Sequence, residues 1–208
     1  FLAAASHMDD AIGQVVKAIE KSGAMETTIF IFTSDNGGVH WAHKGNAYPA
    51  PDPPMSKGFS SNAPLRAGKI TAYEGGIRVP AFITWAATLK PHKTTTRMHV
   101  VDWMPTLANL LGVKMPEGAA WDGQDVWPLL TGEQQAYQNP RTIYTIWNNR
   151  RWEALHHGEW KIVRQKGKAW ELYNLAEDPS EKNNLAQIEF ETAGMLAGLY
   201  EREKMKDK

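Results

Sequence analysis

The 208-residue sequence contains no cysteine, so neither a disulfide nor thiol chemistry is possible in this chain. No apolar run reaches the roughly 18 residues needed to span a bilayer. Neither sign of charge is in excess: Lys plus Arg and Asp plus Glu number 23 each, which argues against general nucleic-acid binding and against a polybasic membrane surface. Hydrophobic residues make up 42% of the chain. The composition therefore predicts a globular protein of one large domain, or one and a half smaller ones.

An amphipathic helix is expected over residues 3–22, ending at Gly23, because apolar residues recur there at three- and four-residue spacing. Residues 1–8 (FLAAASHM) have no initiator methionine at their start and no charged region before an apolar core, so they make a poor signal peptide. We expect the chain to enter this helix partway, as a piece of a longer protein.

Residues 28–38 (TIFIFTSDNGG) run from a β-prone apolar stretch into a carboxylate, a carboxamide and two glycines. In open α/β sheets, ligands bind beyond the carboxyl ends of the strands, where Asp35 and Asn36 are expected to lie. Gly37 and Gly38 would let the backbone turn sharply there. One carboxylate and one neutral oxygen side by side suit a hard cation such as calcium or magnesium. The alternative is an ordinary turn, because Asp, Asn and Gly are common turn residues.

The rest of the chain reads as two parts. The first continues with a long irregular loop over 37–68, a strand over 80–85, a helix over 102–111 with Asp102 as its N-cap, and a connection over 112–140. The second has four short antiparallel strands and a last helix over 187–205. The strands are expected at 142–147, 152–157, 160–164 and 170–173, and the inner residues of the helix are Ile188, Met195, Leu196 and Leu199. We expect an α/β part over 1–135 and a small α+β subdomain over 136–208.

Three blocks carry a family resemblance. They are residues 32–38 (FTSDNGG), residues 64–80 (PLRAGKITAYEGGIRVP), and residues 158–163 (GEWKIV) with 171–186 (ELYNLAEDPSEKNNLA). Together they resemble the C-terminal portion of a sulfatase of the arylsulfatase type, over nearly the whole chain. The resemblance implies the α/β fold of the alkaline-phosphatase superfamily: part of a mixed sheet with flanking helices, followed by a small antiparallel four-stranded sheet with a helix.

The same resemblance implies hydrolysis of sulfate esters with one bound calcium ion and a formylglycine nucleophile made from a Cys or Ser. Asp35 and Asn36 match the late pair of calcium ligands, and Lys69 matches the lysine that contacts the sulfate oxygens. A divalent cation and a fixed ammonium would stabilise the charge that develops on the sulfate, and Lys69 would also protonate the leaving oxygen. The alternative for Lys69 is a solvated loop lysine.

Further residues around these motifs are weighed for substrate binding or structure. His40 and His43 are candidates for the substrate mouth, with solvated loop histidines as the alternative. Trp41 is a candidate for stacking on a sugar ring, whereas the tryptophans of the C-terminal part are expected to form cross-strand core pairs. A small-molecule or carbohydrate sulfate ester is therefore the expected substrate. Glu74 and Arg78 are expected to form a buried ion pair of structural importance.

Several family features are missing from the chain. It contains no Cys and no Ser-x-Pro/Ala-x-Arg motif, and Asp9-Asp10 lies in a helix and is not the family's early metal-binding pair. We therefore expect formylglycine in an N-terminal part outside this chain, and no sulfate-ester hydrolysis by the 208 residues alone. The family is mostly periplasmic, secreted or lysosomal, and the oligomeric state stays open.

Two other functions remain open. One is a phosphoric-ester or phosphonate hydrolase of the same superfamily, which usually carries more His and Asp ligands for two zinc ions. No Asp-x-x-x-His or Asp-His pair follows the first metal motif, so one metal fits better. The other is a non-catalytic carbohydrate-binding relative that keeps the scaffold without the nucleophile.

Overall fold

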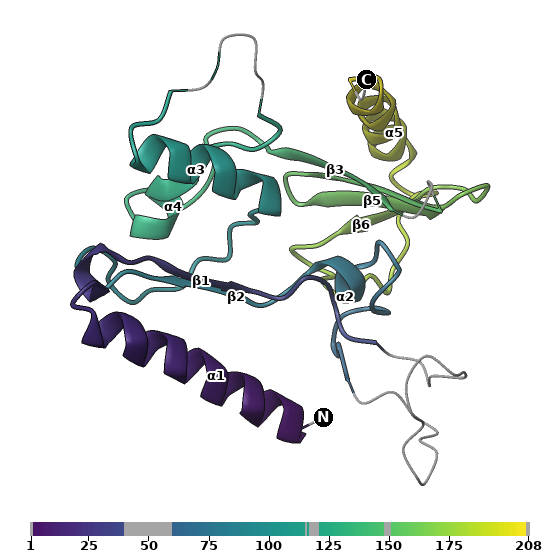
Figure 1. Cartoon of the computed structure of the whole chain (residues 1–208). Helices are drawn as coiled ribbons and strands as arrows, with labels where there is room; N and C mark the ends of the chain where they lie inside the picture. Colours follow the sequence, from purple (N-terminus) through teal and green to yellow (C-terminus); the bar gives the residue numbers. More distant parts are fainter. Residues whose placement is uncertain (1, 40–59, 115, 117–120, 148–150, 207–208) are drawn as a thin grey trace, which may run out of the picture. The chain divides into compact units, whose positions relative to one another are not determined.

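The computed structural model describes residues 2–39, 60–114, 116, 121–147 and 151–206 (Figure 1). These residues form two compact units. One unit contains residues 32–82 and 141–208, with residues 1–3, and the other contains residues 4–31 and 83–140. The candidate metal and sulfate residues therefore belong to the same unit as the C-terminal sheet. The expected domain division between residues 135 and 136 stays a prediction.

The first of these units is built on an antiparallel sheet with strand order β3-β4-β5-β6. The strands are β3 (Thr142–Trp147), β4 (Trp152–His157), β5 (Trp160–Gln165) and β6 (Glu171–Asn174), which confirms the four predicted strands to within a residue or so. Gly158 and Gly167 adopt left-handed backbone angles, with φ of 56° and 80°, in the connections between the last three strands. Turn glycines thus set the spacing that the sequence pattern indicated.

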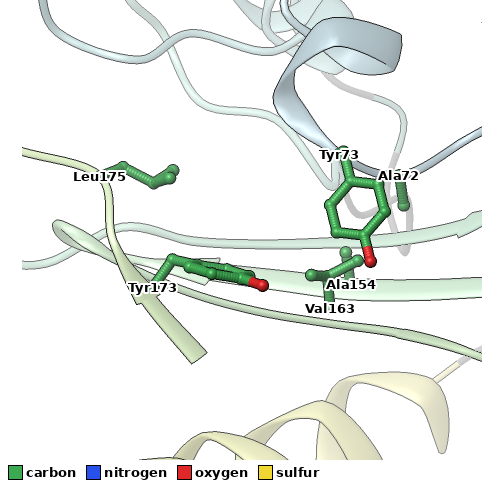
Figure 2. Close-up of a cluster of buried hydrophobic side chains, with 6 residues drawn as sticks. All are labelled: Ala72, Tyr73, Ala154, Val163, Tyr173 and Leu175. Atoms are coloured by element: carbon green, nitrogen blue, oxygen red, sulfur yellow. The ribbon is translucent and has the colours of Figure 1, made fainter. Parts of the chain in front are cut away.

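Successive residues of the central strands β4 and β5 are buried, and successive side chains of a strand point to opposite faces of the sheet. Both faces of this sheet are therefore covered. One face carries Ala154, Val163 and Tyr173, which pack with Tyr73 and Leu175. Figure 2 shows this cluster, in which Tyr73 reaches the sheet from a segment about 80 positions earlier in the chain than Ala154. The contact ties the residues around Lys69 to the C-terminal strands.

The other face packs against the last helix, α5 (Phe190–Lys204). Its buried residues are Leu196 and Tyr200, while Met195 is 54% exposed and Ile188, which precedes the helix, is 75% exposed. The prediction was correct for Leu196 and Leu199 and wrong for Met195 and Ile188. The contact stripe is formed by residues at helical spacing, namely Ala193, Leu196, Ala197 and Tyr200.

The other unit contains the first helix and the middle of the chain. The long helix α1 (Leu2–Lys21) is confirmed, and Gly23 follows it with a φ of 74°. The strands β1 (Phe30–Thr33) and β2 (Ala81–Thr84) pair as a two-stranded sheet, through which the division between the units passes. Among the described residues, no helix is long and apolar enough to serve as a membrane span. Together with the four-stranded sheet, these elements confirm an α/β fold class.

Three details of this part of the chain differ from the prediction. Asp102 precedes the helix α3 (Trp103–Leu110), but its carboxylate caps the 3-10 turn η2 (Val100–Asp102), where it accepts the backbone N–H of His99 at 2.7 Å. It also accepts the N–H of Gln124 at 3.1 Å, which holds the following connection. That connection contains a short helix that the sequence did not indicate, α4 (Trp127–Thr131), whose Leu129 and Leu130 form a core with Val126. The short turn η1 (Met25–Thr27) also shortens the predicted first strand.

Candidate functional site

The predicted metal pair lies directly after β1. Asp35 is exposed and Asn36 is half-buried. One carboxylate oxygen of Asp35 accepts the backbone N–H of Asn36 at 3.0 Å, and the carboxamide nitrogen of Asn36 donates to Gly37 O at 2.9 Å. In the part of the chain that the structure describes, the other Asp35 oxygen and the Asn36 carboxamide oxygen accept no hydrogen bond. These two oxygens suit a hard cation such as calcium, although calcium takes about six to eight oxygen ligands.

The described residues provide only this part of a metal site. They contain no group of three or more His, Cys, Asp or Glu side chains that could hold a metal ion. Asp35 and Asn36 alone do not make up the roughly six to eight oxygen ligands that calcium takes, and their role as metal ligands stays a prediction.

The segment that contains Lys69 lies against this turn. The backbone N–H of Lys69 donates to Gly38 O at 3.1 Å, and the N–H of Gly37 donates to Gly76 O at 2.9 Å. Asn62 strengthens the contact, because its side chain accepts the N–H of Gly38 at 2.8 Å and donates to Gly38 O at 2.9 Å. These bonds bring the backbone at Lys69 next to the Asp35–Gly38 turn. The roles of Asp35, Asn36 and Lys69 stay predictions.

Glycines permit this close approach of backbones. A Cβ on Gly37 would lie 1.8 Å from Gly75 O, and a Cβ on Gly75 would lie 2.3 Å from Arg66 O. A Cβ on Gly76 would lie 2.3 Å from Thr71 O. Neither Gly37 nor Gly38 has a positive φ. The chain bends at Asp35 and Asn36 without a left-handed glycine, and Gly37, Gly75 and Gly76 are required because another backbone passes within contact distance.

The backbone on both sides of Lys69 is strained. Ala67 has a φ of 59° and Ile70 has a φ of 70°. Such angles are uncommon for residues with a side chain and are outliers for a β-branched residue such as Ile70. Each costs of order 1–3 kcal/mol and persists only where the surrounding structure holds it, which is typical of functional loops.

Behind this loop, Glu74 is buried in an ion pair, as predicted, but the predicted partner was wrong. Glu74 starts the short helix α2 (Glu74–Ile77), and its carboxylate lies 2.8 Å from Lys161 Nζ and 3.1 Å from His156 Nε2. Glu74 and Arg78 both lie among the described residues, and they form no ion pair with each other. The backbone N–H of Arg78 donates instead to the backbone oxygen of Glu74 at 2.8 Å. The observed partners of Glu74, His156 and Lys161, lie 82 and 87 positions away in the sequence, whereas the predicted partner, Arg78, lies close by.

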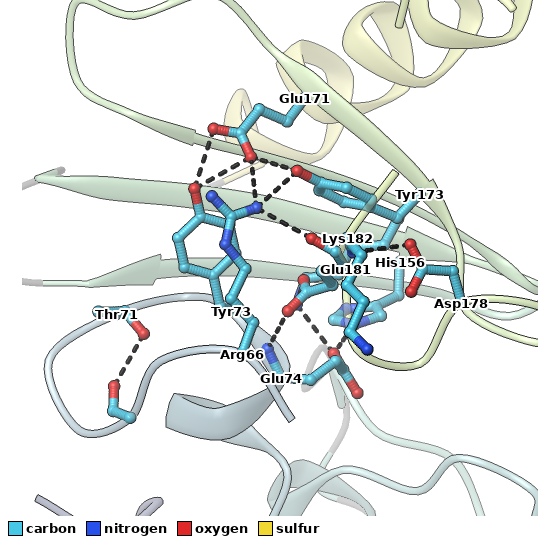
Figure 3. Close-up of polar contacts among 12 residues, drawn as sticks. Arg66, Thr71, Tyr73, Glu74, His156, Glu171, Tyr173, Asp178, Glu181 and Lys182 are labelled. Carbon is cyan, nitrogen blue, oxygen red and sulfur yellow. Dashed lines mark hydrogen bonds and ion pairs between the residues drawn. The ribbon is translucent and has the colours of Figure 1, made fainter. Parts of the chain in front are cut away.

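A second buried carboxylate, Glu181, completes this group (Figure 3). Glu181 Oε1 lies 2.7 Å from Lys161 Nζ, and Glu181 Oε2 accepts the backbone N–H of Glu74 at 2.6 Å. Glu181 also has a left-handed φ of 53°. We call Glu74, His156, Lys161 and Glu181 the ionic cluster.

The two carboxyl groups of the ionic cluster have pKa shifts of opposite sign. Burial opposes ionisation of Glu74, but the hydrogen bond from His156 and the charge of Lys161 outweigh it and hold its pKa far below the ordinary value. Burial raises the pKa of Glu181, although Lys161 acts in the opposite direction. The sequence analysis missed Lys161 and Glu181. The available signal was a lysine that stands between Trp160 and Ile162 near the start of β5.

Arg66 lies beside the ionic cluster. Its guanidinium stacks over the Tyr73 ring at 3.8 Å and donates to Glu171 at 3.0 Å, to the Tyr173 hydroxyl at 2.6 Å and to Glu181 O at 3.2 Å. Burial, and then hydrogen bonding to Glu171, raises the pKa of both Tyr73 and Tyr173, so both phenols stay protonated. Figure 3 shows these side chains converging from the loop, β6 and the segment after it. An open cavity of about 610 Å³ is lined by this group and its neighbours.

Two predicted substrate residues cannot be placed. His40 and Trp41 lie outside the described residues, as does His43. Their proposed contacts stay predictions.

Comparison with known proteins supports one family over the whole chain. The profile of the Sulfatase family matches residues 1–113, and the profile described as N-sulphoglucosamine sulphohydrolase, C-terminal, matches residues 68–205. An N-acetylgalactosamine-6-O-sulfatase of Bacteroides thetaiotaomicron is 30% identical over 95% of this chain and 40% of its own length. Human arylsulfatase A is 38% identical over 60% of this chain and 22% of its own length.

Solved structures agree with the sequence comparisons. A structure from work titled on the metabolism of multiple glycosaminoglycans by Bacteroides thetaiotaomicron matches with a TM-score of 0.76 and 29% identity, over 95% of this chain and 43% of that chain. A structure titled as Ps i-CgsB in complex with k-i-k-neocarrahexaose matches with a TM-score of 0.72 and 27% identity, over 95% of this chain and 40% of that chain. The alkaline-phosphatase-like α/β fold expected from the sequence is thus confirmed.

The chain belongs to the sulfatase family. It spans about 40% of the length of the Bacteroides relative, so the comparisons cover a part of a sulfatase.

Proposed function

We propose that the protein to which this chain belongs is a calcium-dependent sulfuric ester hydrolase, and that Asp35, Asn36 and Lys69 belong to its catalytic pocket. One observation carries this proposal: the backbone of Lys69 is hydrogen-bonded to the turn that follows Asp35 and Asn36. The family match then gives a chemical role to a carboxylate, a carboxamide and an ammonium in one place.

Each residue has a separate task in this proposal. Asp35 and Asn36 contribute oxygens that hold calcium, which when bound would stabilise negative charge on the sulfate. Lys69 donates to the sulfate oxygens and, as charge develops on the ester oxygen, supplies a proton to the leaving group. The hydrogen bond from the Lys69 N–H to Gly38 O is one of the contacts that hold the strained backbone on either side of Lys69 in place.

A sugar sulfate is the proposed substrate class. The supporting facts are the names of similar proteins, an N-acetylgalactosamine-6-O-sulfatase and a structure in complex with k-i-k-neocarrahexaose. His40 and Trp41 are proposed to line the substrate mouth, with Trp41 stacking on a sugar ring. A periplasmic, secreted or lysosomal location is proposed by the same family resemblance.

The 208 residues by themselves are proposed to be inactive, because they contain neither a Cys nor a Ser-x-Pro/Ala-x-Arg motif from which formylglycine is made. Incubation of the chain with a chromogenic aryl sulfate and calcium is expected to give no turnover. Turnover that is lost in Lys69→Ala would contradict this expectation.

The proposed activity is tested in two steps. The coding sequence upstream of Phe1 is read first, and a Cys/Ser-x-Pro/Ala-x-Arg motif is expected there. The protein expressed from the extended reading frame is then assayed on aryl and sugar sulfates. Lys69→Ala is expected to lower kcat by roughly 10²–10³-fold, as for loss of one charge-stabilising donor. Lys168→Ala is the matched control, because Lys168 is exposed in the turn between β5 and β6.

The outcomes separate the alternatives. Hydrolysis of phosphate esters with zinc, and none of sulfate esters, would favour the phosphohydrolase reading. An upstream sequence without the motif, together with binding but no hydrolysis of sulfated sugars, would favour a carbohydrate-binding relative.

A further inference from the structure

The ionic cluster joins three separate parts of the chain at one buried point. Lys161 and Glu181 are fully buried, and Glu74 and His156 nearly so. Glu74 comes from α2, His156 and Lys161 come from the hairpin of β4 and β5, and Glu181 comes from the segment after β6. Ionisable groups are rarely buried unless they are paired, so this arrangement constrains the three segments to one geometry.

The cluster is connected to the proposed pocket through α2. Glu74, the first residue of α2, is held both by its carboxylate and by its N–H, which donates to Glu181. The next residue, Gly75, donates its N–H to Arg66 O at 2.8 Å, in the stretch that leads to Lys69. The residue after it, Gly76, accepts the N–H of Gly37 at 2.9 Å. Gly75, the residue after Glu74, is therefore hydrogen-bonded to the loop that contains Lys69. Gly76, the next residue, is hydrogen-bonded to Gly37, which follows Asn36.

The two glycines of α2, Gly75 and Gly76, cannot anchor this helix to the sheet themselves. Gly75 and Gly76 have no side chains, and any Cβ there would collide with backbone oxygens. Tyr73 anchors the preceding residue through apolar packing on the sheet, and Glu74 supplies the polar anchor. The contacts of Tyr73 and Glu74 with the sheet thus position α2, whose glycines contact the Lys69 loop and the turn after Asp35.

The formal charges of these four side chains balance when one of them holds an added proton. Ionised Glu74 and Glu181 carry two negative charges, and Lys161 carries one positive charge. A proton on His156 or on Glu181 makes the cluster neutral, and histidine changes its charge between about pH 5 and 8. The raised pKa of Glu181 agrees with such a shared proton. Outside the cluster, the guanidinium of Arg66 pairs with the carboxylate of Glu171 at 3.0 Å and donates to Glu181 O, so these two opposite charges compensate each other.

We propose that Glu74, His156, Lys161 and Glu181 are positioning residues that hold Lys69 and the Asp35–Asn36 turn in register, and that loss of the cluster's added proton loosens this hold as the pH rises. The inference rests on the proposed function only for the catalytic meaning of that register. The positioning itself is measurable without any activity.

The first experiment follows hydrogen exchange of the whole chain by NMR, comparing Lys161→Met with wild type. The amides of Gly37, Lys69 and Gly75 are expected to exchange roughly tenfold faster or more, while the amides paired between β4 and β5 keep their protection. Lys204→Met is the matched control, because Lys204 pairs with Glu153 and Glu201 and takes no part in the cluster. Unchanged exchange at all three loop amides in a folded Lys161→Met chain overturns the proposal.

Because Lys161→Met leaves two buried carboxylates and can unfold the chain, Glu181→Gln decides in that case. A glutamine oxygen still accepts the N–H of Glu74, and the remaining Glu74–Lys161 pair is neutral without an added proton. In wild type, exchange of the three loop amides, corrected for the intrinsic rate, is expected to rise between about pH 6 and 8. In Glu181→Gln this rise is expected to disappear. The same pH dependence in both proteins contradicts the proposal.

Activity in the extended protein provides an independent readout. Glu181→Gln is expected to flatten the alkaline side of the kcat profile while KM changes little, whereas Glu201→Gln, at an exposed ion pair, leaves the profile unchanged. If the wild-type protein hydrolyses no sulfate ester, the proposed function fails, and the exchange experiment still decides whether the cluster positions the loop.

Discussion

Glu74 illustrates what local sequence can and cannot predict at the scale of a residue. The sequence predicted that it is buried in an ion pair with Arg78, in the turn that follows Lys69. The partners were wrong, because Lys161 and His156 come from strands more than 80 positions away. Charge pairing at short spacing can be read along the chain, whereas pairing across the fold depends on which strand faces the loop.

Glu74→Gln tests this pairing by chemical denaturation. The substitution removes the negative charge that Lys161 and His156 contact, while Lys161 keeps its contact to Glu181 at 2.7 Å, so the free energy of unfolding at pH 7 is expected to fall by about 1–3 kcal/mol. Glu201→Gln, at an exposed pair, is the control and is expected to cost less than about 1 kcal/mol. Equal small effects of the two substitutions would show that the buried pair contributes no more than a surface pair.

The same variant has a defined pH dependence. The folded-state pKa of Glu74 is lowered, so its contribution is fully present above the unfolded value of about 4.5 and is lost as the pH falls below it. The difference in stability between wild type and Glu74→Gln is therefore expected to shrink between about pH 5 and pH 3. A difference that grows on acidification would mean that the carboxyl group is stabilised in its neutral form.

At the scale of secondary-structure elements, the glycines of α2 and the residues of α5 show how packing selects side chains. α2 approaches the Lys69 loop so closely that backbone oxygens occupy the space of a Cβ. α5 packs on the sheet through the buried Leu196 and Tyr200, with Ala193 and Ala197 beside them. Glycines at the α2 contact and alanines in the α5 stripe are not revealed by a pattern of large apolar residues.

Gly75→Ala is expected to destabilise the chain by about 1–3 kcal/mol or more, because its Cβ would lie 2.3 Å from Arg66 O and 2.5 Å from Ala67 O. Gly13→Ala is the matched control, since a Cβ at Gly13 in α1 meets nothing within 4 Å. This second change is expected to raise helix stability by roughly 0.5–1 kcal/mol. Urea unfolding measures both, and a neutral Gly75→Ala would contradict the close approach of α2.

Leu196→Ala and Met195→Ala test the orientation of α5. Leu196 is buried, so its truncation is expected to cost about 2–5 kcal/mol. Met195 is 54% exposed, and its truncation is expected to stay within about 0.5 kcal/mol. The reverse order of effects, measured by thermal or urea unfolding, would restore the original sequence prediction for this helix.

At the scale of the whole molecule, the chain leaves large apolar side chains in contact with solvent. On α1, Met8, Ile12 and Val15 are 51%, 40% and 58% exposed and recur at helical spacing. The sheet β1–β2 has two strands in the described residues, which leaves strand edges open to pairing. These features favour self-association of the chain when it is expressed by itself.

Sedimentation velocity and thermal unfolding at several protein concentrations test this expectation. The isolated chain is expected to self-associate with rising concentration, and Val15→Lys is expected to reduce the effect because it places a charge in the apolar stripe of α1. Lys17→Glu, at another position of α1, controls for a general change of charge. A sharp thermal transition that does not depend on concentration would count against the expectation.

The sequence by itself determined the elements and the family. Hydrophobic alternation, turn glycines and the blocks around residues 32–38, 64–80 and 158–186 were sufficient for the four-stranded sheet, the long first helix and the sulfatase assignment, because these signals are local. The tertiary structure decided which residues meet: it placed Lys161 and Glu181 behind the Lys69 loop, replaced Arg78 as the partner of Glu74, and turned Met195 to solvent. The physical reason is that close backbone approach and the pairing of buried charges depend on atoms far apart in the chain, and a local pattern carries no record of that distance.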